Sequence, residues 1–333
     1  MKTNRKALLE RLRALKPGLA GQGILEQSTH ILFRGGRAAT YNDEVAVSVE
    51  VGLDFEAAIE ADPLLKLLAK LPDDEVELAL DGGELSVRGA RRRAGLRVEA
   101  GIALPVDAAG QPEEWRPVPE DMIEAIGVVG SCCSGDASHP ILRCVHLAPD
   151  RVEACDGFQA CRWPLRTGLA KPVLVRRSSL RAVESAKPAE WALTEGWVHW
   201  RAGGLSLACR RVAGEYPDVG PHLEGEGGAV KLPKGLASAV DKAAVFVERD
   251  ALEMVRVELR SGKLKVTGRG PAGWFSEVLD VGYAGEPLAF DIDPRLLLEL
   301  AARTDEVTIG TGRLLARSDK WRYVTCTQAP GAK

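Results

Sequence analysis

Apolar residues recur at the spacing of a helix in six stretches of the chain. In the first stretch, Leu8, Leu12 and Leu15 fall on one face, and Pro17-Gly18 ends the pattern. Such one-sided patterns predict amphipathic helices that pack their apolar face against the rest of a domain. The other five expected helices cover residues 63–71, 122–126, 179–186, 233–245 and 294–302.

Runs of β-branched, leucine and aromatic residues flank these helices and predict strands. Turn residues separate neighbouring runs, as at Gly35-Gly36 and at Asp81-Gly82-Gly83. The expected strands are residues 24–33, 38–41, 44–51, 76–80 and 85–88, then 141–147, 152–155, 158–164, 191–194, 197–200 and 205–211, then 254–259, 263–267, 274–281, 307–309, 314–317 and 322–327. Each third of the chain therefore has the order helix, strands, helix, strands, which predicts the α+β class.

One helix–strand unit is repeated along the chain. Asp62 starts a leucine-rich helix and Asp74 starts the next strand, and Asp293 and Asp305 stand at the same spacing of 12 residues. A weaker copy starts at Arg177, so the copies begin about 115 residues apart. Chance similarity is the alternative, but the identical spacing argues against it. This period exceeds the roughly 20–50 residues of solenoid repeats and fits a whole small domain.

Two stretches rich in Gly, Pro and Glu divide the chain into thirds, at residues 106–119 and 224–228. Such composition is typical of linkers. We therefore predict three repeats of similar size, each able to build its own core. Their expected boundaries are residues 1–113, 114–224 and 229–333.

The composition is that of an ordinary soluble globular protein, with 45% hydrophobic and 27% charged residues and a net charge of −3. No apolar run approaches the roughly 20 residues of a membrane span, and the N-terminus has no signal-peptide core. We therefore expect a cytoplasmic protein. Its seven scattered cysteines do not suggest a disulfide framework. A near-neutral total still permits a segregated basic face.

Four short motifs carry a resemblance to a known family. Residues 214–219 read GEYPDV, similar to GxFPDY, and residues 154–160 read ACDGFQA, similar to ATDGHRL. Residues 87–93 (VRGARRR) are similar to VRSGRSR, and Tyr323-Val324 stands where the family has a terminal YVVMPM. In these motifs and their order, the whole chain resembles the bacterial sliding clamp, the beta subunit of the replicative DNA polymerase holoenzyme.

The resemblance implies a DNA clamp fold in which three repeated domains, each with two helices packed on β-sheets, form half of a ring. Two chains would join head to tail as a homodimer, with the helices lining a hole for duplex DNA. A ring that slides needs diffuse attraction to phosphates and no base-reading contacts.

Basic residues on the expected helices agree with a DNA-lined hole, since Lys66 and Lys70, for example, lie one turn apart. The alternative is a solvated helix surface, the usual reason for a few lysines. The helix near residues 121–129 departs from the pattern because it carries Asp121 and Glu124 and no basic residue. The expected DNA-contacting residues are Lys2, Lys6, Arg13, Lys66, Lys70, Arg181, Lys187, Lys234, Lys242, Arg295 and Arg303.

The resemblance also implies a groove between the second and third domains that holds a short peptide of the polymerase or of the clamp loader. Leu142, Gly157, Pro217 and Val324 match the residue types of the family, whereas most other positions do not, so a different peptide preference is expected. The groove residues carried over are Leu142, Cys155, Gly157, Phe158, Gln159, Ala160, Pro217, Pro221, His222, Val324, Cys326, Thr327 and Gln328. The seam between subunits is expected to join Leu67, Leu71, Ala94 and Leu96 to Val245 and Phe246 of the next chain.

Other groups of residues do not indicate a metal site, a DNA-binding patch or a base-stacking site. The two cysteines, aspartate and histidine within residues 132–139 match no standard zinc spacing, so neither a metal nor another cofactor is expected. Residues 91–93, three arginines, fit a DNA patch and a solvated hairpin turn equally well. Trp191, Trp197 and Trp200 fit sheet packing better than base stacking.

We therefore expect a non-enzymatic sliding clamp, a processivity factor that holds a polymerase on double-stranded DNA of any sequence. The alternative is a clamp-fold protein that does not encircle DNA and acts as a scaffold or inhibitor of replication proteins. An enzyme has no support, because the sequence has no phosphate-binding glycine loop, dinucleotide fingerprint or nucleophile elbow.

Overall fold

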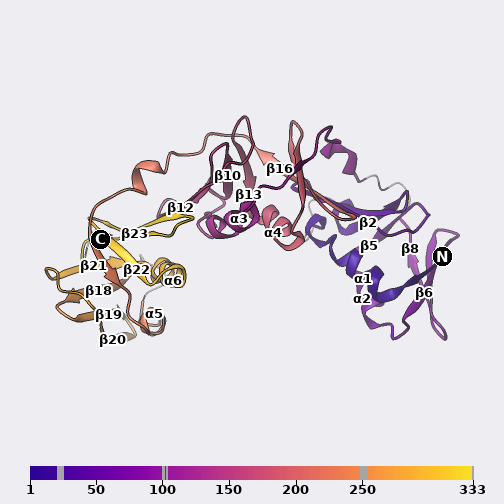
Figure 1. Ribbon diagram of the computed structural model, residues 1–333. Coiled ribbons are helices and arrows are strands. Elements are labelled where there is room, and N and C mark those ends of the chain that lie inside the picture. The colour runs from indigo at the N-terminus through magenta and orange to yellow at the C-terminus, as the bar shows by residue number, and fades with distance from the viewer. Residues whose placement is uncertain (21–25, 100–101, 103, 248–253, 332–333) are drawn as a thin grey trace. The chain divides into compact units, whose positions relative to one another are not determined.

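The computed structural model describes residues 1–20, 26–99, 102, 104–247 and 254–331 (Figure 1). The chain forms two compact units, each assembled from two separate stretches. Unit 1 contains residues 1–127 and 173–213, and unit 2 contains residues 128–172 and 214–333. The three-domain boundaries expected from the linkers stay predictions.

The described residues contain six α-helices, at the places where apolar periodicity predicts them. The first begins later than expected, because Asn4 accepts a hydrogen bond from the Ala7 amide at 3.0 Å and so caps the helix. The residues before this cap form strand β1 (Lys2–Asn4) instead. The helices are α1 (Arg5–Arg13), α2 (Ala61–Lys70), α3 (Met122–Gly130), α4 (Arg177–Ala186), α5 (Leu236–Ala244) and α6 (Pro294–Arg303). No described helix is long and apolar enough to span a bilayer.

The described residues of unit 1 form two antiparallel sheets. The larger runs in the order β5 (Ala57–Glu60), β2 (His30–Arg34), β3 (Arg37–Tyr41), β4 (Val45–Glu50), β16 (Leu205–Val212), β15 (Trp197–Ala202), β14 (Glu190–Leu193) and β9 (Arg116–Pro117), and β13 (Val173–Arg176) also pairs with β16. The smaller runs in the order β1, β6 (Glu75–Asp81), β7 (Glu84–Arg88) and β8 (Arg93–Arg97). Residues 24 and 25 of the first expected strand lie outside the described residues, and that strand begins at His30.

Unit 2 also contains two antiparallel sheets. The larger runs in the order β10 (Cys144–Ala148), β11 (Arg151–Cys155), β12 (Gln159–Pro164), β24 (Arg322–Cys326), β23 (Arg313–Arg317), β22 (Glu306–Gly310) and β17 (Gly228–Lys231). The smaller runs in the order β20 (Gly273–Asp280), β19 (Lys263–Gly270), β18 (Val255–Arg260) and β21 (Leu288–Ile292).

The strands follow one plan three times along the chain. Four strands precede the second helix of each repeat (β2–β5, β10–β13 and β18–β21), and three follow it (β6–β8, β14–β16 and β22–β24). The third strand of one repeat pairs with the last strand of the next, as β4 with β16 and β12 with β24. The remaining third strand, β20, and the remaining last strand, β8, are each at the edge of a sheet.

The helices pack in pairs against the sheets. Figure 1 shows α1 beside α2 and α5 beside α6, and both pairs are in contact. Leu8 and Leu64 are fully buried in the first pair. Arg5 ties that pair together, because its guanidinium donates to the carbonyl oxygens of Leu68 and Asp73, both at 2.7 Å.

Tryptophans fill the core of the larger sheet in unit 1. The rings of Trp191 and Trp200 stack with centroids 5.6 Å apart, and both are buried, as is Trp197. The sheet-packing interpretation of these three residues is confirmed, because a base-stacking platform needs exposed rings.

Candidate partner groove, DNA-contacting helices and assembly edges

The floor of the expected partner groove lies within unit 2, where β12 pairs with β24. Cys155, Ala160 and Val324 stand directly opposite one another on β11, β12 and β24 and therefore share one face of the sheet. Val219, from the segment that follows β16, packs onto this apolar cluster, and half-buried Leu142 lies at its margin. Residues far apart in the sequence thus form one buried apolar cluster.

A tight turn between β11 and β12 forms the rim of the groove. Oδ1 of Asp156 accepts hydrogen bonds from the amides of Phe158 and Gln159, both at 2.9 Å. Gly157 has a φ of 94°, a conformation that residues with a side chain rarely adopt. The amide of Cys326 donates to the Phe158 carbonyl at 2.8 Å. This frame leaves the Phe158 side chain 53% exposed beside the apolar floor.

Tyr216 anchors the segment that covers part of the floor. Its hydroxyl accepts a hydrogen bond from the Cys155 amide at 2.8 Å, and its ring stacks on His146 with centroids 4.8 Å apart. Burial raises the pKa of Tyr216 far above its ordinary value, so the phenol stays neutral. The GEYPDV motif that carries the family resemblance therefore has a structural role here.

Glu153 is a buried charge on the same face of the sheet as Cys155, two residues before it on β11. Its carboxylate receives hydrogen bonds from Arg151 at 2.9 Å and from Arg162 at 2.7 Å, and it lies 2.8 Å from Nδ1 of His146. Burial alone would raise the pKa of Glu153, but the hydrogen bonds from His146, Arg151 and Arg162 outweigh it and hold the pKa below the ordinary value of 4.5.

We expect Glu153→Gln to lower the free energy of unfolding at pH 7 by about 2–4 kcal/mol, because it leaves two arginines without their buried anion. A carboxylate with a lowered folded-state pKa stabilises above its ordinary pKa of 4.5 and loses that contribution as the pH falls through the folded-state pKa. The difference between variant and wild type should therefore shrink in acid. Urea titrations between pH 7 and pH 3 measure it.

Asp150→Asn is the matched control, because Asp150 is an exposed carboxylate that pairs with the same Arg151 at 2.8 Å. Exposed pairs contribute little, so we expect almost no change in unfolding. A Glu153→Gln penalty that stays constant down to pH 3 would contradict the assigned network.

The structure places the expected groove residues in three environments. Gln159 departs from the expectation: its side chain is buried, donates to Asp156 at 3.0 Å and accepts from the Tyr323 hydroxyl at 2.8 Å, so it supports the turn from inside. Buried are Cys155, Gln159, Ala160 and Val324; half-buried are Leu142, Thr327 and Gln328; exposed are Gly157, Phe158, Pro217, Pro221, His222 and Cys326.

Most of the expected DNA-contacting cations are exposed. Lys66 pairs with Asp62 at 2.7 Å, and Lys242 pairs with Glu277 at 2.9 Å. Exposed pairs of this kind are weak and leave the cation available to a phosphate. The exposed residues are Lys2, Lys6, Arg13, Lys66, Lys70, Arg181, Lys187, Lys234, Lys242 and Arg295.

Three of these lysines are not on a helix, contrary to the expectation. Lys2 lies on β1 opposite Glu77, because the cap at Asn4 starts α1 after it. Lys187 follows α4 in a left-handed conformation that ends the helix, and Lys234 lies in the turn before α5.

Arg303 is the clear correction, because its side chain is only 9% exposed. Its guanidinium donates to the Val128 carbonyl at 2.9 Å and to Glu299 at 2.8 Å, and it lies within 3.8 Å of the Cys132 and Cys161 sulfurs. An arginine held in this way secures the end of α6 and is removed from the set of candidate DNA contacts.

Two of the expected seam residues lie on edge strand β8, and Phe246 lies next to edge strand β20. Ala94 and Leu96 are half-buried on edge strand β8, and Leu67 and Leu71 are half-buried on and just after α2. Phe246 follows α5, and its ring would lie 3.5 Å from a Cβ built on Gly273, the first residue of edge strand β20.

Large apolar side chains are exposed beside the β20 edge. Val245 is 75% exposed, Trp274 63% and Val278 56%. Sequence reasoning missed Trp274 and Val278, although alternation along residues 273–280 marks them as partners on one face of a strand.

Solved bacterial proteins share this architecture over nearly the full chain. DNA polymerase III subunit beta of Pseudomonas aeruginosa matches with a TM-score of 0.85 at 18% identity, covering 99% of both chains. A sliding clamp from Bartonella birtlesii matches with 0.86 at 18% identity, and the beta subunit of Thermotoga maritima with 0.82 at 16%, each covering 98% of both chains. The chain has the bacterial sliding-clamp fold.

The clamp fold confirms the fold class predicted from the residue patterns and motifs. No family model matches the chain, and neither does any curated protein sequence. The sliding-clamp fold is thus carried here by a divergent sequence, at 13–18% identity to the solved clamps compared.

Proposed function

We propose that this chain is a DNA sliding clamp, a non-catalytic processivity factor that encircles duplex DNA as a homodimer and tethers a replicative polymerase and other replication proteins in the cytoplasm. The observation that carries the proposal is the pairing rule of the three repeats. Third strands pair with the last strands of the following repeat at β4–β16 and β12–β24, which leaves β20 and β8 as the complementary edges.

A second copy of the chain satisfies both edges at once. Unpaired edge strands expose rows of backbone donors and acceptors, and natural proteins cover such edges. When β20 of one copy pairs with β8 of the other, the same contact forms twice and closes a two-membered ring. The exposed Val245, Trp274 and Val278 beside β20 would then be covered as well.

The exposed cations support DNA as the occupant of the ring. Lys6, Arg13, Lys66 and Lys70 lie on α1 and α2, which pack side by side. Attraction between such cations and phosphates is independent of base sequence and releases counterions, so it weakens steeply with salt. A closed ring needs no tighter contact, because topology retains the DNA.

The groove of unit 2 supports a peptide as the partner contact. Its floor is apolar, its rim carries an exposed aromatic ring, and short extended peptides commonly anchor one or two apolar side chains in such sites. We propose that a polymerase and a clamp loader use this groove through a short motif.

Retention on circular DNA tests the proposal. We expect the ring, assembled by reassociation of dissociated subunits around a nicked plasmid, to stay bound through gel filtration and to be released when a restriction enzyme linearises the plasmid. Log affinity falls as log salt concentration rises. Joint replacement of Lys6, Arg13, Lys66 and Lys70 by Ala should make this fall shallower, by up to about 0.9 in slope per lost phosphate contact.

The mass in solution and a plasmid pre-linearised before assembly serve as controls. Equal retention on circular and linear DNA, or a monomeric mass at assay concentration, would contradict encirclement. That result would favour the alternative, a clamp-fold scaffold or inhibitor that binds replication proteins without enclosing DNA.

A further inference from the structure

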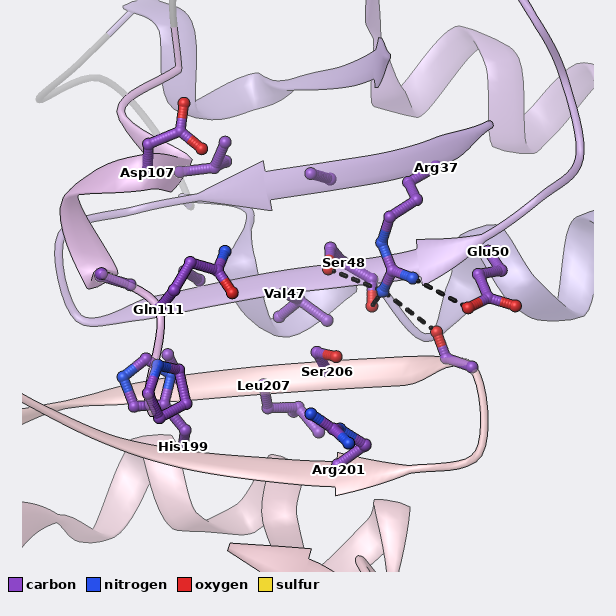
Figure 2. Close-up of a pocket in the computed structure, with 18 of the residues that line it drawn as sticks. Arg37, Val47, Ser48, Glu50, Asp107, Gln111, His199, Arg201, Ser206 and Leu207 are labelled. Carbon is purple, nitrogen blue, oxygen red and sulfur yellow. Dashed lines mark hydrogen bonds and ion pairs between the residues drawn. The ribbon is translucent and has the colours of Figure 1, made fainter. Parts of the chain in front are cut away.

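Unit 1 contains a cavity of about 670 Å³ that the proposed clamp function does not use. Its floor is the face of the sheet formed by β3, β4, β16 and β15, and its wall is the segment of residues 106–115 (Figure 2). The volume is within the roughly 300–1,000 Å³ typical of ligand sites. It therefore has room for several residues of an extended peptide.

The cavity occupies the same place in the repeat as the partner groove. Residues directly opposite one another in antiparallel strands share a face, so strand register identifies equivalent positions. Across β3, β4, β16 and β15, one opposed row is Tyr41, Ala46, Ala208 and His199. Across β11, β12, β24 and β23, the equivalent row is Cys155, Ala160, Val324 and Leu315, which contains the floor of the groove.

The adjacent row explains why the cavity is open in unit 1. In unit 1 this row is Ala39, Ser48, Ser206 and Arg201. In unit 2 it is Glu153, Arg162, Arg322 and Arg317. Three small side chains in unit 1 thus replace the long charged side chains of unit 2. The space above Ser48 and Ser206 remains free, and Arg201 stands at its end (Figure 2).

The charged side chains that line the cavity favour an anion. Arg37 is engaged, since it donates to Glu50 at 3.1 Å and to the Ser48 hydroxyl at 3.0 Å (Figure 2), and Arg34 pairs with Asp107 at 2.9 Å. Arg201 is the lining arginine whose acidic partner lies outside the cavity.

Arg201 is held in position for a ligand. Its guanidinium lies 3.8 Å from the centroid of the Trp115 ring, and its one ion pair with a described residue is a 3.4 Å contact with half-exposed Glu190. Nearby His199 adds no charge at neutral pH, because burial lowers its pKa to about 4. The adjoining pocket of about 360 Å³ contains Glu113 and Glu114 and so suits an acidic ligand less well.

We propose that the cavity of unit 1 is a second peptide-binding site, which takes an extended acidic segment of a partner protein. An apolar side chain of the peptide would lie over Ala46 and Ala208, and a carboxylate would pair with Arg201. The choice of a peptide over a small anion rests on the proposed function, through the equivalence with the unit 2 groove.

Selection from a random library of 12-residue peptides on phage tests the site. The bait is the full-length Leu142→Asp protein, in which the unit 2 groove is disabled, with counter-selection on Leu142→Asp/Arg201→Glu. We expect acidic peptides that carry one or two large apolar residues. Fluorescence anisotropy of a synthesised, fluorescein-labelled winner should show at least tenfold weaker binding to Arg201→Glu, and a similar loss when its acidic residues become amides.

Two further variants separate the site from misfolding and from the groove. Ser206→Trp keeps every charge but fills the cavity, and it should also weaken binding at least tenfold. Arg317→Glu changes the equivalent position of unit 2, where Arg317 is exposed, and should leave binding unchanged. Unfolding midpoints of all variants are measured alongside.

Two results would overturn the proposal: no peptide that distinguishes Arg201→Glu from its parent, or winners that lack acidic residues. Failure of the proposed function is seen separately. Peptides selected on the wild-type protein that bind Leu142→Asp and Arg201→Glu as tightly as wild type would dock at neither site, which contradicts both proposals. If the selected peptides lose affinity for Arg201→Glu but bind Leu142→Asp as tightly as wild type, the second site is supported and the groove of unit 2 is not.

Discussion

Phe246→Asp is expected to convert the proposed dimer into a folded monomer of 35.7 kDa that cannot stay on circular DNA. Phe246 follows α5 and contacts the start of edge strand β20, where a second copy would cover it. Full burial of such a side chain contributes about 1.5–3 kcal/mol, which is an upper bound because Phe246 is already half-buried, and the proposed ring would contain that contact twice. An unpaired carboxylate at the same place adds a desolvation cost. Sedimentation across a concentration series measures the mass.

Phe158→Asp is the matched control for the seam. It makes the same chemical change at a 53% exposed phenylalanine of unit 2, in the groove turn and on neither sheet edge. We expect this variant to remain a dimer. A Phe246→Asp protein that keeps the wild-type mass would show that the subunits join elsewhere.

Leu142→Asp is expected to abolish stimulation of the polymerase while the dimer and its retention on DNA stay intact. Leu142 packs at the margin of the apolar cluster formed by Cys155, Ala160 and Val324. A few apolar side chains that contact the peptide dominate such interfaces, and losing one costs about 2–4 kcal/mol, which weakens binding roughly 30- to 1,000-fold. The carboxylate that Leu142→Asp introduces would also stand unpaired in the pocket that the peptide occupies. Titration with the C-terminal tail of the cognate polymerase measures the loss.

Pro221→Asp is the control for the groove, because it adds the same charge at an exposed position of the rim. Rim positions are solvated in the complex, so we expect a much smaller change in affinity. Wild-type affinity of Leu142→Asp for the tail would mean that partners dock on another surface.

Amphipathic periodicity predicted the helices well but their ends less well. Leucine patterns located α1, α2 and α6 because burial of one helix face dominates local preference. The start of α1 was misplaced since the Asn4 cap competes with helix extension toward Lys2, and β6 offers those residues a strand partner. Cap geometry and strand pairing are not visible in a hydrophobic pattern.

The short strands before helices escaped prediction for a different reason. β5, β13 and β21 have four or five residues each and run almost directly into α2, α4 and α6. A run this short has too few residues to show alternation. Their strand conformation depends on pairing with β2, β16 and β18, and none of these strands is the neighbour of its partner in the sequence.

The groove residues were carried over from the family resemblance, the DNA-contacting residues were chosen as basic residues on expected helices, and tertiary contacts correct one residue of each set. Residues of three of the four motifs gather on the larger sheet of unit 2, because β12 pairs there with β24. Arg303 looked like a free helix cation, but its guanidinium is closed off by Val128 and Glu299. Gln159 looked like a groove residue, but strand alternation turns it to the opposite face from Ala160.

By itself, the sequence determined the α+β class, the threefold repeat and the resemblance to sliding clamps, since each follows from local periodicity or from the order of motifs. Only the tertiary structure decided which strand edges are free, which arginines are buried and where small side chains leave a cavity. These features depend on register between strands that are distant in the chain. A single residue of slip would turn Ser48, Ser206 and Arg201 to the other face of the sheet.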